Sequence, residues 1–200
     1  MIHIFRESKK SKRVLVLFHG TGGDEHDLIP LCEDIDSDAS ILSLRGNVSE
    51  NGMLRFFVRF SNGKFDQESI KNEANQIFTF ISDFLLRNKR NASDLVFVGF
   101  SNGANMIVAL MLLYPKLVRC ALVLHGLQPI EPAPSVDLNG ASVFVSVGLG
   151  DQMIEPSKTM ALISLLRAKG ANVTVHKDDS GHTINEGESD AVREFLSNNN

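Results

Sequence analysis

Short, uninterrupted apolar runs recur along this chain of 200 residues and alternate with longer stretches of helical periodicity. Runs of Val, Leu, Ile and Phe with few polar positions are typical of strands buried on both faces, as in a parallel sheet. Residues 2–5 form a further short run, which we expect to be an antiparallel edge strand. The six main runs cover residues 13–18, 40–44, 95–99, 118–124, 142–147 and 173–177.

The stretches between these runs predict helices. Residues 67–89 carry apolar side chains at intervals of three and four, and Asp66 stands where a helix N-cap is expected. The last helix is expected to begin at Asn185, where Glu188 completes the pattern of a capping box. Further helices are expected over residues 103–113 and 156–168, and a loop with a short helix over 20–35.

This alternation of strands and helices predicts an α/β fold with three layers. Helices would flank a mostly parallel sheet of six to seven strands, with right-handed crossovers. The length favours a single domain over residues 1–200. Two long connections, residues 45–66 and 125–141, are each too short to form a cap domain. Loops of this length are usually functional or disordered.

Composition and charge narrow the range of partners. Hydrophobic residues make up 43% of the chain, charged residues 22%, and the formal net charge is −4. That balance does not favour nucleic acid, and the longest apolar run is too short for a membrane span. The N-terminus lacks the pattern of a signal peptide. We therefore expect a soluble cytoplasmic protein with no nucleic-acid partner and no stable membrane insertion, and a homodimer remains open.

The segment Gly99-Phe100-Ser101-Asn102-Gly103 lies between a predicted strand and a predicted helix. A G-x-S-x-G string at such a junction is typical of a nucleophile elbow, in which a sharp turn presents the serine hydroxyl. The N-terminus of the following helix favours negative charge that develops beside the serine. The alternative is a glycine-containing turn that Ser101 merely caps.

A serine needs a neighbouring base, and three histidines follow Ser101 in the chain. His176 lies inside a predicted strand, and His125 comes too early for the order Ser, acid, His. His182 lies in a loop after the last predicted strand, where an α/β sheet gathers its site. We therefore take His182 as the base, the alternative being a loop histidine without a role.

The acid is expected after the penultimate strand. Asp151, in Gly148-Leu149-Gly150-Asp151, follows the run 142–147 and would orient the imidazole of the base. Glu155 is a weaker candidate about one helical turn further on. Asp178 and Asp179 are close to the base in sequence but belong to the end of a strand.

Two backbone N–H groups are expected to form an oxyanion hole. One belongs to Asn102, the residue after the nucleophile, and the other to Thr21 in the glycine-rich segment 19–23 that follows the first buried strand. His19 is expected to orient that segment through hydrogen bonds.

The sequence contains no clear motif for binding a cofactor or a metal ion. Neither a P-loop nor a dinucleotide fingerprint is present. The spacing of His19, Asp24, Glu25, His26 and Asp27 matches no known metal site, and a solvated polar loop is the expected alternative. We therefore expect no cofactor and no metal.

These segments resemble one family. The chain is similar to the carboxylesterase/phospholipase branch of the α/β hydrolases, which includes acyl-protein thioesterases and bacterial predicted esterases. The resemblance covers nearly the whole chain and rests on residues 19–25, 99–104, 148–151 and 181–182, with further similarity at 45–52. It implies a small hydrolase fold without a cap domain, a metal-independent triad, and activity on carboxylic esters or thioesters. The chain departs from the thioesterases at Asn102, where they commonly carry Gln, and in the Phe- and Arg-rich segment 55–60.

Candidate substrate-binding residues lie in the connection 45–66 and after two predicted strands. The alternatives for the residues in 45–66 are pocket lining and simple packing on the sheet, and for Arg55 and Arg59 an anionic substrate or a solvated surface. Leu127 and Met153 are weaker candidates for the pocket. The candidates in 45–66 are Met53, Phe56, Phe57 and Phe60.

Three functions remain open at this point. The first is hydrolysis of small to medium acyl esters through an acyl-enzyme intermediate. The second is a thioesterase or lysophospholipase that uses the same triad. The third is a binding protein that keeps the hydrolase fold without catalysis, against which the complete set of Ser101, Asp151 and His182 argues.

Overall fold

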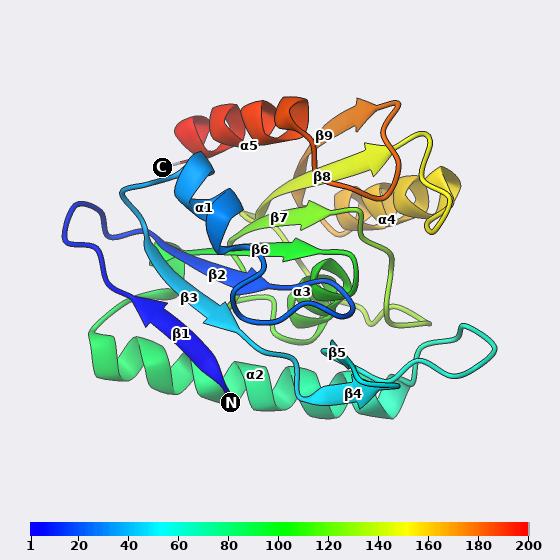
Figure 1. Ribbon diagram of the computed structural model, residues 1–200, viewed down its shortest axis with the longest axis horizontal. Helices are drawn as coiled ribbons and strands as arrows, with labels where there is room; N and C mark the ends of the chain where they lie inside the picture. Colours follow the sequence, from blue (N-terminus) through cyan, green and yellow to red (C-terminus); the bar gives the residue numbers. More distant parts are fainter. Residues whose placement is uncertain (200) are drawn as a thin grey trace.

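The computed structural model describes residues 1–199, and its centre is a seven-stranded sheet (Figure 1). The strand order is β1-β3-β2-β6-β7-β8-β9, with β1 antiparallel to β3 at one edge and every other pair parallel. The predicted α/β fold with a mostly parallel sheet is confirmed. The strands are β1 (His3–Arg6), β2 (Val14–Phe18), β3 (Ser40–Leu44), β6 (Leu95–Phe100), β7 (Cys120–Leu124), β8 (Ser142–Gly148) and β9 (Asn172–Asp178).

Helices cover both faces of this sheet and complete the three layers (Figure 1). One face packs against α1 (Ile29–Ile35) and α5 (Glu186–Asn198). The other packs against α2 (Gln67–Asn88), α3 (Asn102–Leu113) and α4 (Pro156–Ala168). The central strand β2 is fully buried along its length, as its unbroken apolar run predicts.

The helix start that the sequence predicted for α2 is present. The Asp66 carboxylate accepts hydrogen bonds from the backbone N–H groups of Glu68 and Ser69, which have no partner within the helix. No helix within residues 1–199 is long and apolar enough to cross a lipid bilayer.

The connection 45–66 contains a hairpin that the sequence pattern did not predict. Strands β4 (Val48–Glu50) and β5 (Met53–Arg55) pair antiparallel around a turn at Asn51 and Gly52, both with positive φ. The Phe56 N–H donates to Asn102 Oδ1 at 2.7 Å, and thereby fastens the chain after the hairpin to the start of α3. A short 3₁₀ helix, Ala92–Asp94, precedes β6.

Candidate active site

Ser101 occupies a sharp turn between β6 and α3. Its φ of 52° lies in the left-handed region, which non-glycine residues adopt mainly where the surrounding structure demands it. The Ser101 N–H donates to Leu124 O at 2.9 Å, so the turn is tied to the neighbouring strand β7. This is the strained strand–turn–helix geometry that a nucleophile elbow requires.

The two glycines around the turn are required by close packing. A Cβ at Gly103 would lie 2.0 Å from Phe18 O and 2.6 Å from His19 O, which are backbone atoms. A Cβ at Gly99 would lie 2.6 Å from Ile107 Cδ1. Both contacts are far inside van der Waals distance, so side chains at these positions would push α3 away from the sheet.

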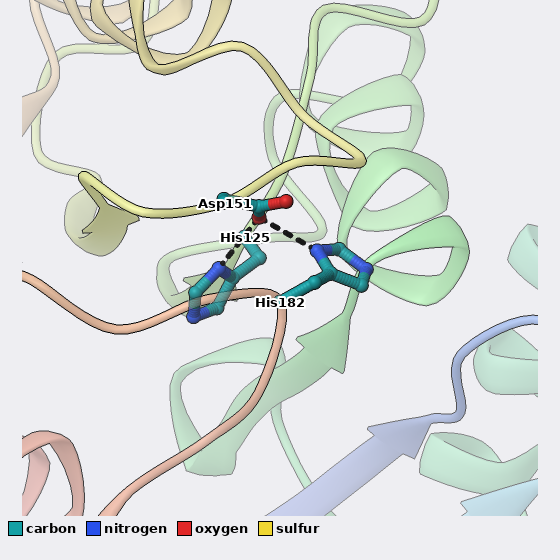
Figure 2. A group of neighbouring side chains, drawn as sticks. All are labelled: His125, Asp151 and His182. Carbon is teal, nitrogen blue, oxygen red and sulfur yellow. Dashed lines mark hydrogen bonds and ion pairs between the residues drawn. The ribbon is translucent and has the colours of Figure 1, made fainter.

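Asp151 and His182 form a hydrogen-bonded pair at the carboxyl ends of the strands (Figure 2). Asp151 follows β8, and His182 lies in the loop between β9 and α5. His182 Nδ1 lies 2.7 Å from Asp151 Oδ2; because an ionised carboxylate only accepts, the imidazole donates through Nδ1. This bond leaves Nε2 of His182 as the nitrogen that can accept a proton.

The Asp151 carboxylate is held at both oxygens. Oδ1 accepts from the backbone N–H groups of Met153 and Ile154 at 2.8 and 2.9 Å, and Oδ2 faces two imidazoles. Burial works to raise the pKa of Asp151, but hydrogen bonds from His182, Ile154, His125 and Met153 outweigh it and lower that pKa. Asp151 is therefore ionised at neutral pH.

The loop that carries His182 is organised by Asp178, at the end of β9. The Asp178 carboxylate accepts from the Ser180 N–H at 3.0 Å and from the Asn185 side-chain amide at 2.5 Å. Gly150 N–H donates to Ser180 O at 2.9 Å, which joins this loop to the loop of Asp151. The His182 ring packs on Phe100 with 4.9 Å between ring centroids, directly before Ser101 in the chain. Within residues 1–199 the Ser101 hydroxyl makes no hydrogen bond.

The two expected oxyanion donors lie on segments that touch. Asn102 is the first residue of α3, so its N–H has no acceptor within the helix. A Cβ at Gly20 would lie 2.9 Å from Phe100 Cδ1, which places the segment of Thr21 against the elbow. Within the described part of the chain, the Thr21 N–H donates to no backbone or side-chain acceptor.

His19 holds this segment by hydrogen bonds at both ring nitrogens. Its Nδ1 donates to Gly20 O at 2.6 Å, and its Nε2 accepts from Gly46 N–H at 3.0 Å. Burial is the main cause that lowers the pKa of His19, so the ring is neutral and can accept at Nε2. The expected orienting bonds of His19 are present.

The sequence reasoning missed a second histidine in contact with Asp151. His125 was excluded as the catalytic base only because of its position in chain order. Its Nδ1 lies 3.1 Å from Asp151 Oδ2 (Figure 2). Its Nε2 lies 3.5 Å from Glu188 Oε2 on α5. The capping box expected at the start of α5 is therefore only half formed. The Asn185 side chain accepts from the Glu188 N–H, but the buried Glu188 side chain is directed to His125. Its position at the end of β7 was the only signal in the sequence for this contact.

Two groups of side chains within residues 1–199 lie close enough to hold a metal ion, and other contacts account for both. In the first, two imidazoles bond to one carboxylate oxygen. In the second, Glu25 is already paired with Arg45, and His26 bonds to Asp24. The groups are His125, Asp151 and His182, and Asp24, Glu25 and His26.

Two residues expected to line the substrate pocket lie instead in the core, which corrects that expectation. Phe56 packs on Phe18 and His19, and Phe57 packs on Phe65, so neither ring presents surface to a ligand. Arg55 is also buried rather than solvated, and pairs with Glu50 at 2.9 Å.

The other expected substrate residues are more exposed. Met53 is 41%, Phe60 49% and Met153 73% exposed. Leu127 is half-buried and lines a cavity of about 530 Å³ between the segments 63–67 and 127–131 and α4. Met53 lies against the oxyanion segment, because a Cβ at Gly22 would be 3.8 Å from its Cγ.

Comparison with known proteins gives one consistent answer. The model of the phospholipase/carboxylesterase family matches residues 1–200. MhqD of Bacillus subtilis (strain 168), which its name describes as a hydrolase, is 37% identical over 195 residues, 98% of this chain and 97% of the relative. A carboxylesterase from Bacillus cereus superposes with a TM-score of 0.95 at 37% identity, over 99% of this chain and 94% of that one. A carboxylesterase from Mesorhizobium loti gives 0.90 at 34% identity, over 94% and 90%. The chain therefore belongs to the phospholipase/carboxylesterase family and is an esterase-like hydrolase of the α/β-hydrolase superfamily.

Proposed function

We propose that the chain is a single-domain serine carboxylesterase that cleaves esters of small to medium acyl chain through Ser101, His182 and Asp151. One observation carries the proposal: His182, held by Asp151 at 2.7 Å, packs on Phe100, directly before a serine whose φ is 52°. A strained serine beside an oriented imidazole is the arrangement that activates a hydroxyl for attack on a carbonyl.

The first half of the reaction forms an acyl-enzyme. Ser101 Oγ attacks the ester carbonyl carbon while His182 Nε2 takes the hydroxyl proton, and Asp151 stabilises the resulting imidazolium. The carbonyl oxygen becomes an oxyanion, to which the Thr21 and Asn102 N–H groups donate. The imidazolium then protonates the alkoxy oxygen as the C–O bond breaks, so the alcohol leaves and Ser101 carries the acyl group.

The second half repeats these steps with water. His182 Nε2 removes a proton from a water molecule, and its oxygen attacks the acyl carbon. The same two N–H groups receive the second oxyanion. Collapse of this intermediate returns the proton from His182 to Ser101 Oγ and releases the carboxylic acid. No cofactor or metal takes part in the proposed cycle.

Apolar side chains support an acyl group as the bound part of the substrate. Met53 is exposed beside the oxyanion segment, and Leu149 and Met153, in the loop that carries Asp151, are 52% and 73% exposed. A single exposed apolar residue is ordinary, but several around one site are typical of a ligand-binding rim. The same observation favours a second candidate function, cleavage of longer acyl thioesters or lysophospholipids by the same three residues.

The proposal is tested by pre-steady-state kinetics with p-nitrophenyl esters. We expect a burst of p-nitrophenol of about one equivalent per site, and a transient mass increase on Ser101 equal to the acyl group. Absence of both in an enzyme that turns over would contradict an acyl-enzyme. A series from acetate to palmitate, run in parallel with thioesters, decides between the two candidates. A flat response to chain length would contradict a shaped apolar pocket.

A further inference from the structure

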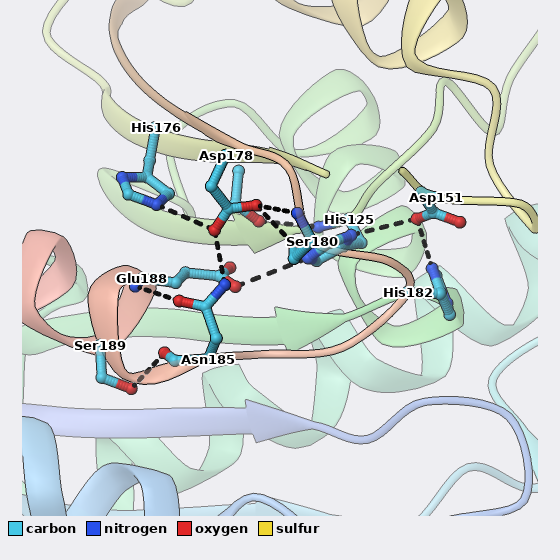
Figure 3. A network of polar contacts seen from close by, with 10 residues as sticks. His125, Asp151, His176, Asp178, Ser180, His182, Asn185, Glu188 and Ser189 are labelled. Carbon is cyan, nitrogen blue, oxygen red and sulfur yellow. Dashed lines mark hydrogen bonds and ion pairs between the residues drawn. The ribbon is translucent and has the colours of Figure 1, made fainter. Parts of the chain in front are cut away.

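Behind the proposed triad lies a second, fully buried pair of ionisable side chains. His125 Nδ1 is 3.1 Å from Asp151 Oδ2, the oxygen that also receives His182, and His125 Nε2 is 3.5 Å from Glu188 Oε2. Each of the His125 and Glu188 side chains is 1% exposed. Figure 3 shows the four groups in a continuous line from His182 through Asp151 and His125 to Glu188. We call His125 and Glu188 the rear pair.

His125 lies between two carboxylates, those of Asp151 and Glu188, in an interior with little other charge. The titratable groups that face His125 are Asp151 from the loop after β8, His182 from the loop after β9, and Glu188 from α5. Strands β6 and β8 and helix α3, which pack beside it, contain no titratable side chain. Both Glu188 oxygens are buried, and His125 is the only cationic partner they have within residues 1–199. A buried unpaired carboxylate is costly, so the arrangement favours an imidazolium between the two acids.

The local electrostatics agree with a charged His125. Burial opposes the charge, but the nearby Glu188 carboxylate, followed by the hydrogen-bonded Asp151 carboxylate, outweighs it and raises the pKa of His125. A protonated ring carries an N–H at both nitrogens, so it can donate to Asp151 through Nδ1 and direct a second N–H toward the Glu188 carboxylate, 3.5 Å from Nε2.

The backbone around His125 is shaped to hold the ring in this place. His125 has φ of 51°, and its N–H donates to Ser146 Oγ at 3.1 Å. A Cβ at Gly148 would lie 2.9 Å from His125 Cε1, so only glycine leaves room for the imidazole. A non-glycine residue in the left-handed region persists where its surroundings over-determine it, often at functional sites.

The geometry points to a role for the rear pair in the reaction: His125, backed by Glu188, is a positioning residue that fixes Asp151 and partly offsets its negative charge toward His182. This inference rests on the proposed function, because it concerns the base of the same triad. A cation with its ring centroid 5.4 Å from that of His182 disfavours a second positive charge there. Without this cation, the Asp151 carboxylate would act undiminished on His182 and favour the imidazolium, which cannot accept the Ser101 proton.

Two like charges at this separation are worth about two pH units at an effective dielectric constant of about 20. Solvent reaches part of the His182 ring, so we expect about half of that effect. Loss of the cation should therefore move the acidic limb of the activity profile upward by about one pH unit. At a pH on that limb, the rate constant should fall about tenfold.

The test uses the full-length variants His125→Gln and Glu188→Gln, with Glu194→Gln, an exposed residue on the same helix, as the matched control. The readouts are kcat/KM for p-nitrophenyl acetate and the second-order rate of Ser101 labelling by a fluorophosphonate probe, from pH 5 to 9. We expect both rear-pair variants to shift the acidic limb upward, and the control to overlay the wild type. Acidic limbs that coincide with the wild type in His125→Gln and Glu188→Gln would overturn the inference.

A second measurement needs no variant to fold. In wild-type protein with ¹⁵N-labelled histidine, we expect one buried ring to show two protonated nitrogens at pH 7, where an unperturbed imidazole, with a pKa of about 6.5, is mostly neutral. Neutral rings for all buried histidines would overturn the inference. Failure of the wild type to label at Ser101 would instead contradict the proposed function, and the NMR result would still decide the charge of His125.

Discussion

Replacing Asp151 by asparagine removes the negative charge of the side chain and keeps nearly the same shape. Oδ1 accepts from the Met153 and Ile154 N–H groups at 2.8 and 2.9 Å, so the amide oxygen of the new side chain must take that position. The amide nitrogen then occupies the place of Oδ2, where His182 and His125 both present N–H donors. Donor would face donor, and His182 would turn or switch tautomer to avoid it.

The size of the loss follows from the charge that disappears. In the transition state the His182 imidazolium lies beside the Asp151 carboxylate, with charge centres about 4 Å apart. At an effective dielectric constant of about 20, that attraction is worth ~4 kcal/mol, or roughly a thousandfold in rate. The wrong tautomer adds to this loss, so we expect kcat/KM to fall by at least about 10³.

The assay is kcat/KM for p-nitrophenyl acetate at pH 8, with the burst amplitude measured on the same enzyme. Thermal unfolding followed by circular dichroism shows whether the variant keeps its fold. Glu155→Gln, which changes the weaker acid candidate nearby, is the matched control and should retain near wild-type activity. A folded Asp151→Asn enzyme within tenfold of the wild type would refute the assignment of Asp151.

Three further predictions address the scaffold and the base. Gly103→Ala places a Cβ 2.0 Å from Phe18 O, so urea unfolding should show a loss of at least about 3 kcal/mol; a loss under 1 kcal/mol would contradict the packing argument. Asp178→Asn removes a carboxylate whose pKa is held below its ordinary value by Ser180 and Asn185 against the effect of burial, so its stabilisation is present above about pH 4 and lost at lower pH. Urea midpoints should therefore differ from the wild type at pH 7 and converge toward pH 2, and a constant gap would refute this. His182→Ala should lose about 10³-fold or more in kcat/KM with an unchanged circular dichroism spectrum, and an unfolded variant would count against a loop-borne base.

Much of the fold follows from the sequence because a parallel sheet leaves a plain pattern. Its strands are buried on both faces, so each appears as an unbroken apolar run, and the edge strand β1 appears as a weaker one. The hairpin of β4 and β5 was missed because strands of three residues are too short to show a period of two. Its turn at Asn51-Gly52 was the available signal, since that dipeptide favours a tight hairpin.

The candidate site was predictable to the extent that it depends on the order of the serine, the acid and the histidine along the chain. Ser101, Asp151 and His182 each follow the carboxyl end of a parallel strand. These ends lie on the same side of the sheet, so topology brings Asp151 and His182 together. The contact of His125 with the same carboxylate depends on side-chain direction across β7 and β8, which no sequence spacing specifies. Phe56 and Phe57 show the same limit, because an aromatic run does not reveal which rings face the core.

The most direct test of a serine nucleophile is covalent labelling. Wild-type protein is treated with a fluorophosphonate probe, digested, and examined by mass spectrometry beside Ser101→Ala. We predict one adduct per chain, on the peptide that contains Ser101, and none in the variant. No adduct on the native protein, or equal labelling of Ser101→Ala, would contradict the proposed mechanism.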